Sequence, residues 1–223
     1  MRYTEFTPFD LVLLAQGLGV TIGLFLATSA IGLVIGVLWG IVRFYRVPVL
    51  MQVITFVSEV LKNSPVLVQL FLVFFGFPGL LKINMTPVNA ALITLSLNTA
   101  AFIYVIAVSA IESIGRDQVE AARVFGLTRW QVLRFVIAPQ AAAFSIGPLT
   151  ALLVNQLQVT SLISVIGVMD LAKIGANLNL RTLQPFIVWT VIGIVYYVAA
   201  KLVAMLGTAL ENRLRAHTAF RGL

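Results

Sequence analysis

The sequence predicts an all-α integral membrane protein with about five transmembrane helices. Hydrophobic residues make up 60% of the 223 residues and charged residues only 10%, and the mean hydropathy is +1.03. A soluble domain needs more charge to keep its surface hydrated, so many of these apolar side chains must face lipid. Several runs of the chain have the length of about 20 apolar residues that crosses a bilayer as a helix.

We interpret residues 1–223 as one transmembrane domain. Its spans are expected at approximately 11–42, 65–81, 84–111, 139–158 and 183–206, with a cytoplasmic loop at 112–138. The first apolar run is too long for a cleavable signal peptide, and Arg2 is the single basic residue before it. We therefore expect this run to remain as a membrane helix.

The first span, 11–42, carries no charge and is closed by Arg43 and Arg46. Gly32, Gly36 and Gly40 follow one another at four-residue spacing, which allows a second helix to approach closely. Glycine is also common in membrane helices generally, so close packing and simple composition both remain open here.

The next segment, 47–61, is interrupted by polar residues, and we expect an interfacial helix there rather than a span. Glu59 and Lys62 lie three residues apart and are expected to form an ion pair. Ser64 is expected to cap the second span, with Pro65 in its first helical position.

The third span, 84–111, has no charged residue. The fourth starts near Pro139, and its apolar run continues to Met169, which is too long for one simple helix. We expect the polar residues 155–161 to break it. Residues 170–181 are expected to form a loop before the fifth span, and a short basic tail begins at Glu211.

Polar side chains within the third and fourth runs have two possible roles. A buried polar group costs free energy unless it is paired, so such groups either line a path for a polar solute or bond to neighbouring helices. The candidate path residues are Asn98, Thr99, Asn155, Gln158, Thr160 and Ser161.

The net charge of +7 reflects membrane orientation rather than affinity for nucleic acid, because the basic residues flank the spans. The cytoplasmic loops of a membrane protein carry more basic residues than the loops on the other side. The richer side holds Arg43, Arg46, Lys62, Arg116, Arg123, Arg129, Arg134, Arg213, Arg215 and Arg221, and the poorer side holds Arg2, Lys82, Lys173 and Arg181. We therefore expect the N-terminus outside and the C-terminus in the cytoplasm.

The composition argues against an enzyme. The chain has no cysteine and one histidine, His217, so a metal centre is not expected. It has neither a GxxxxGK[ST] nor a GxGxxG sequence, nor a catalytic dyad within the spans. No catalytic residue and no cofactor bound by this chain is expected.

The charged loop 112–138 is the most informative segment. Gly126 is expected to end one short helix, and Thr128 with Gln131 to open a second through a capping box. Apolar residues on this loop, including Phe125 and Trp130, would be exposed to water unless a partner protein covered them.

This loop resembles the EAA loop of ABC importer permeases. Glu120-Ala121-Ala122, Gly126 and Pro139 match that pattern, while Val136 and Ala138 replace the usual isoleucine and leucine. The resemblance implies the type I importer permease fold and a loop that docks on a separate ATPase. The implied coupling residues are Glu120, Ala121, Ala122, Arg123, Gly126, Leu127 and Arg129; the two arginines pair with acidic groups of the ATPase or only set orientation.

Nearly the whole chain is similar to polar amino acid permeases. Residues 62–71 (KNSPVLVQLF) resemble that family's RGTPLLVQLF, and 139–141 (PQA) and 165–168 (VIGV) have counterparts too. The resemblance implies a bacterial inner-membrane complex of an ABC ATPase dimer, a second permease and an extracytoplasmic solute-binding protein. ATP and Mg would bind the ATPase, and a small polar solute would cross the pore.

Four charged positions of that family are neutral here. Val105 and Val108 replace a glutamate and an arginine, and Gln158-Val159 replace a lysine and an aspartate. The loss favours a less charged solute, or a heterodimer whose other permease contacts the solute. A secondary transporter or channel is the alternative function, but it usually needs a titratable group deep in a span, and Glu59 is expected near the interface.

Overall fold

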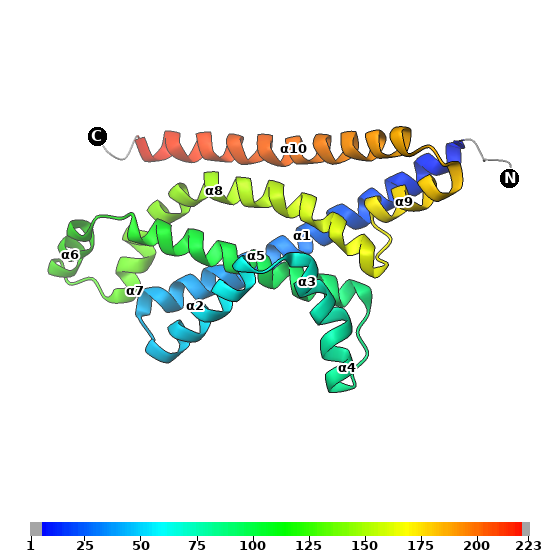
Figure 1. Cartoon of the computed structure of the whole chain (residues 1–223). Coiled ribbons are helices and arrows are strands. Elements are labelled where there is room, and N and C mark those ends of the chain that lie inside the picture. Colours follow the sequence, from blue (N-terminus) through cyan, green and yellow to red (C-terminus); the bar gives the residue numbers. More distant parts are fainter. Residues whose placement is uncertain (1–5, 220–223) are drawn as a thin grey trace.

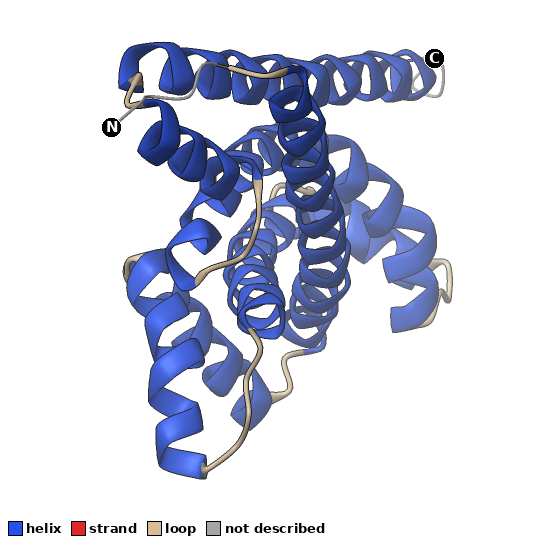
Figure 2. Cartoon of the chain, turned by 90° about the vertical axis from the view of Figure 1, so that its right-hand side faces the viewer, coloured by secondary structure: helices blue, strands red, loops and turns tan. Residues whose placement is uncertain are grey.

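A computed structural model describes residues 6–219 of the chain, and helices and loops account for all of that range (Figures 1 and 2). Arg2 and Arg221, which entered the orientation argument, lie outside the described residues, as do the side chains of Arg215 and His217.

Four helical segments within 6–219 are long and apolar enough to cross a membrane: Pro8–Tyr45, Pro87–Glu112, Arg129–Ile166 and Pro185–Arg213. A fifth span is possible if Pro48–Asn63 and Val66–Leu81, which meet at a bend of 110°, are counted as one broken span. The expectation of an all-α membrane protein with about five spans is confirmed in this form.

The first long helix, α1 (Pro8–Tyr45), packs lengthwise against α5 (Pro87–Glu112). A Cβ added to Gly32 would lie 2.7 Å from the Cβ of Thr99, and one added to Gly40 would lie 2.8 Å from the Cβ of Ala107. The row Gly32, Gly36 and Gly40 therefore forms the contact surface of α1 with α5. Of the two explanations for this spacing, close helix packing is confirmed.

The helix α2 (Pro48–Asn63) contains the expected ion pair, with 2.7 Å between Lys62 Nζ and Glu59 Oε1. The expected cap at Ser64 is wrong. Ser64 follows the last residue of α2, and its hydroxyl donates to the Val60 carbonyl at 2.7 Å. A serine hydroxyl readily bonds a carbonyl four residues earlier, and here that option wins over capping the next helix. Pro65 is extended and stands just before that helix.

The region expected to hold the second span comprises three short pieces. They are α3 (Val66–Phe71), a π-helical turn (Leu72–Gly76) and α4 (Phe77–Leu81). In Figure 1 this arm projects away from the rest of the bundle. Its base is fixed by Leu70, which is fully buried among residues of α1 and α5.

The fourth long segment changes its helical form three times. It begins with α7 (Arg129–Gln131), continues through a π-helical turn (Val132–Ile137) into α8 (Ala138–Val159), and ends in a 3₁₀ turn (Thr160–Ile166). The expected break of the long apolar run at its polar residues is therefore confirmed.

The loop expected at 170–181 is wrong, because the chain forms α9 (Leu171–Thr182) there. Asp170 caps this helix by accepting the Lys173 N–H at 2.8 Å. Leu171, Ile174 and Leu178 lie on its buried face, at the i, i+3 and i+7 spacing of an amphipathic helix. They pack against α1 and the start of α10 (Pro185–Ala219), which lies beside α8 (Figure 1).

Candidate functional site

The loop expected to contact a partner folds as two helices joined by a glycine turn. Its first helix, α6 (Arg116–Val124), ends before Gly126, whose φ is +81°. The Gly126 N–H donates to the Arg123 carbonyl at 2.9 Å, and the Leu127 N–H donates to the Ala122 carbonyl at 3.2 Å. The expected helix end at glycine is confirmed, and a side chain at this left-handed position would be strained.

The second helix of the loop opens with the expected capping box. The Thr128 N–H donates to Gln131 Oε1 at 2.8 Å, and the Gln131 N–H donates back to Thr128 Oγ1 at 3.3 Å. These reciprocal bonds satisfy donors that a helix start would otherwise leave unpaired. They fix the direction in which the chain re-enters the membrane domain.

The base of the loop is anchored in an apolar cluster. Ile114, Ala122, Val132, Leu133 and Ile137 are buried there, and side chains from the end of α1 pack against them. A further link comes from Gln140 of α8, whose amide donates to Gln118 Oε1 of α6 at 2.8 Å. The loop is thus a fixed part of the membrane domain rather than a flexible connection.

The tip of the loop is apolar and open to solvent. Val124 is 86% exposed and Phe125 is 84% exposed. Two adjacent large apolar side chains in water are unfavourable for a free surface and typical of an anchor that a partner protein covers.

The residues expected to couple the loop to an ATPase have different environments. Those that are exposed are Glu120, Ala121, Arg123, Gly126 and Arg129, whereas Leu127 is half-buried and Ala122 is buried in the base. Ala122 therefore shapes the loop from inside and is not accessible for direct contact.

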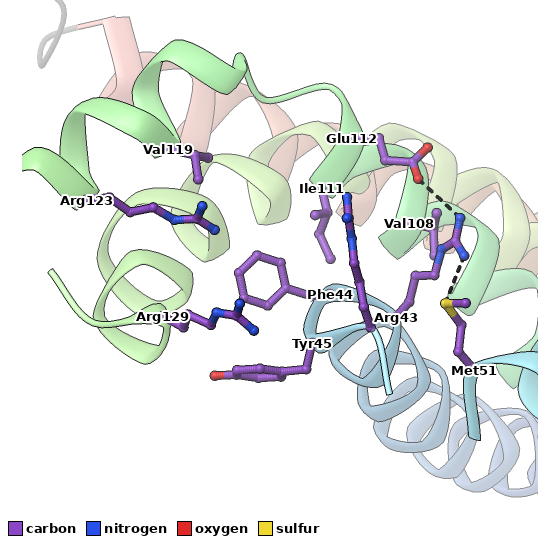
Figure 3. Close-up of a pocket in the computed structure, with 11 residues that line it drawn as sticks. Arg43, Phe44, Tyr45, Met51, Val108, Ile111, Glu112, Val119, Arg123 and Arg129 are labelled. Carbon is purple, nitrogen blue, oxygen red and sulfur yellow. Dashed lines mark hydrogen bonds and ion pairs between the residues drawn. The ribbon is translucent and has the colours of Figure 1, made fainter. Parts of the chain in front are cut away.

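A cavity of about 560 Å³ lies between the loop and the adjoining ends of α1, α2 and α5 (Figure 3). The guanidinium groups of Arg123 and Arg129 point toward it from the loop (Figure 3). Arg43 also lines it, pairs with Glu112 at 3.7 Å, and contacts Met51 Sδ at 3.0 Å. No motif predicted that Arg43, at the end of α1, would lie near the two loop arginines.

Three of the expected solute-path residues are engaged inside the chain. The Asn98 amide donates to the Leu61 carbonyl at 3.1 Å and lies 3.4 Å from Gln69 Oε1. Thr99 is fully buried against Gly32, and the Thr160 hydroxyl donates to the Leu157 carbonyl at 2.6 Å. The structure therefore places these three among the packing contacts of the helices.

The other three remain accessible at the end of α8. Asn155 and Gln158 are exposed, and Ser161 is half-buried. Gln158 and Ser161 line a cavity of about 370 Å³ together with Tyr196 and Tyr197 of α10. The six predicted residues thus divide into an internal group and a group whose side chains are at least partly exposed.

Two polar contacts near the opposite end of the molecule from the loop were not expected. Buried Asp10 of α1 pairs with Arg181 of α9. Asp170 is also buried, and its Oδ2 lies 3.4 Å from the Tyr196 hydroxyl. Burial raises the pKa of Asp170 to about 6 despite the hydrogen bonds from the backbone of Lys173 and Ala172.

Across residues 6–219, no three histidine, cysteine, aspartate or glutamate side chains gather closely enough to hold a metal ion. The accessible candidate regions are the loop with its exposed tip and the cavity beside α10 that Gln158 and Ser161 line.

Residues 32–216 match the protein family described as "Binding-protein-dependent transport system inner membrane component". The chain is 30% identical over 198 residues to the probable amino-acid ABC transporter permease protein YckA of Bacillus subtilis, covering 89% of this chain and 87% of the relative. It is 29% identical over 204 residues to the glutamine transport system permease protein GlnP of Escherichia coli, covering 91% and 93%. The L-cystine transport system permease protein TcyL of B. subtilis is 31% identical, covering 89% and 85%.

Solved structures agree with this assignment of fold. The chain superposes on a chain of a crystal structure of an amino acid ABC transporter with histidines, with a TM-score of 0.84 and 26% identity over 94% of this chain and 100% of that one. It also matches an inward-facing structure of the MetNI methionine ABC transporter, with a TM-score of 0.80 and 18% identity over 94% and 99%.

Proposed function

We propose, from the premise that this chain belongs to the family of binding-protein-dependent transport system inner membrane components, that it imports a polar amino acid or a similar small polar solute. Members of the family are multi-pass permease subunits without enzymatic activity, and a separate ATPase drives them. Relatives named for amino acid, glutamine and L-cystine transport support the proposed class of solute.

The observation that carries the mechanism is the exposed pair Val124 and Phe125 on a loop with a buried base. We propose that these side chains enter a groove of the ATPase and that Glu120, Ala121 and Leu127 surround the contact. Because the base packs against α1 and continues into α8, a movement of the docked ATPase would displace both membrane helices together.

We also propose that the loop faces the cytoplasm, with the N-terminus outside. Support comes from the concentration of arginines around the loop and at the end of α1, because the positive-inside rule assigns the side richer in basic residues to the cytoplasm. The same orientation puts the Asp10–Arg181 pair and Asp170 on the outer side of the membrane.

For the solute path we propose direct contact with Asn155, Gln158 and Ser161, which are accessible near α10. Asn98, Thr99 and Thr160 would act indirectly, by holding the surrounding helices in place. The neutral residues Val105, Val108, Gln158 and Val159 support a heterodimer in which the other permease supplies charged contacts.

Affinity for the ATPase tests this proposal most directly. The purified permease is immobilised in detergent, and binding of its ATPase is followed by interferometry. Phe125→Ala should weaken binding about thirtyfold, the effect of removing an interface anchor of about 2 kcal/mol. Phe135→Ala serves as the control, because Phe135 is 62% exposed on the same segment but belongs to the π-helical turn. Equal affinity for both variants and the parent would reject the docking surface.

A further inference from the structure

The arginine-lined cavity has a chemistry that import of a polar solute does not require. Four arginines contribute to its wall: Arg43, Arg46, Arg123 and Arg129. We propose that this cavity binds a phosphate-bearing anion, either the headgroup of an anionic phospholipid or a soluble phosphate compound. The lipid source rests on the proposed cytoplasmic position of the loop.

The charges of the wall are strongly unbalanced. Glu112 is the one carboxylate in the lining, so four arginines face it with a formal excess of three positive charges. Glu112 pairs with Arg43. Arg46, Arg123 and Arg129 have no acidic partner among the side chains that the structure describes. Like charges around one cavity repel one another, and an anion between them removes that repulsion.

The type of cation favours phosphate over a simple halide. A guanidinium group presents a planar set of N–H donors that matches two oxygens of one phosphate, and several such groups can share its remaining oxygens. The volume of about 560 Å³ is much larger than a phosphate ion and leaves room for an attached alcohol such as glycerol. The side chains of Phe44 and Tyr45 supply apolar wall for that part (Figure 3).

The position of the cavity suits a lipid headgroup. It lies at the end of the membrane helix α1, where Arg43 follows a long uncharged run, and tyrosine is enriched at this level of a bilayer. Arg123 and Arg129 come from the two helices on either side of Gly126, whereas Arg43 and Arg46 come from the end of α1. An anion bound to all of them would tie the loop to the membrane helix.

Native mass spectrometry of the detergent-purified full chain tests the site without measuring transport. The protein is titrated with phosphatidylglycerol or with phosphatidylcholine of the same acyl chains. We expect phosphatidylglycerol to bind more tightly than phosphatidylcholine. Its affinity should fall about thirtyfold in the double variant R123Q/R129Q, since each basic group near an anionic lipid raises the affinity about fivefold. The matched control R116Q/R134Q removes two arginines of the same segment that do not line the cavity.

A competition experiment then distinguishes a lipid headgroup from a soluble phosphate compound as the bound anion. Displacement of the lipid by glycerol 3-phosphate assigns the site to soluble phosphates, and a preference for phosphatidylglycerol without displacement assigns it to lipid. Equal binding of both lipids with no effect of glycerol 3-phosphate, or equal losses in both double variants, would overturn the proposal. Arg46→Gln repeats the test outside the loop in case the double variant does not fold, and its affinity for phosphatidylglycerol should fall about fivefold. None of these results depends on the ATPase or the imported solute.

Discussion

Gly36 of α1 faces Ile103 of α5 so closely that a Cβ added to the glycine would lie 2.6 Å from the Cβ of Ile103. Gly36→Ala should therefore force the two helices apart and destabilise the protein by about 1–3 kcal/mol, the usual cost of overpacking. Thermal unfolding in detergent measures the effect. The control is Gly23→Ala on the same helix, because a Cβ there would meet nothing within 4 Å. Equal melting temperatures for the two variants would show that this contact is not limiting.

The ion pair between Asp10 and Arg181 joins the start of α1 to the end of α9. Arg181→Gln should destabilise the protein by about 1–3 kcal/mol, because a buried carboxylate loses its charged partner. The remaining bonds to Asp10 come from Thr7. Combining this change with Asp10→Asn should restore part of the stability, and denaturant unfolding of the four proteins gives the coupling energy. Additive losses would mean that the two side chains act independently.

Asp170 should make stability depend on pH on the acidic side of neutrality. Its pKa is raised from 3.8 to about 6 in the folded protein, so folding favours the protonated form. The contribution of the protonated carboxyl to the free energy of unfolding is fully present below pH 3.8, decreases as the pH rises toward 6, and is lost above that. The melting temperature of Asp170→Asn minus that of the parent should therefore rise between these limits and then level off. Asparagine keeps the helix cap. A constant difference would contradict the shifted pKa.

Glu120→Lys should leave insertion into the membrane intact and reduce ATP-driven uptake at least about tenfold, the effect of about 1.4 kcal/mol at the ATPase contact. The side chain is exposed on α6, so the change alters the docking surface and not the fold. Asp117→Lys is the matched control, since it makes the same charge change on the same helix. Uptake by proteoliposomes, normalised to inserted protein, provides the measurement. Parent-level uptake in the Glu120 variant would remove this residue from the coupling surface.

Local patterns predicted the parts of the structure that local physics decides. The turn at Gly126 and the capping box of Thr128 with Gln131 each depend on groups within a few residues, and both are present. The glycine row of α1 correctly predicted which face of this helix packs closely against another helix, although it did not indicate that the other helix would be α5. For α9, by contrast, the polar residues between Leu171 and Leu178 led to the prediction of a loop. The segment is an amphipathic helix whose apolar face packs on α1 and α10.

The contacts that the sequence did not predict are those between distant elements. Asp10 and Arg181 are 171 positions apart, and neither residue has a neighbour that signals the pairing. The cavity at the coupling loop likewise needs Arg43 and Arg129 to be brought together by the packing of α1, α5 and the loop. The polar group at Asn98 was recognised, but only the fold showed that its bonds go to Leu61 and Gln69.

The π-helical turn at Val132–Ile137 joins the coupling loop to α8 without a flexible linker. Such a turn holds one more residue than an α-helical turn. Its conversion to α-helix would shift the register by one position, turning α8 by about 100° and advancing it by about 1.5 Å relative to the loop. Under the proposed docking, a change in the hydrogen bonds of this one turn would therefore link a screw motion of α8 to the placement of the loop tip at Val124 and Phe125.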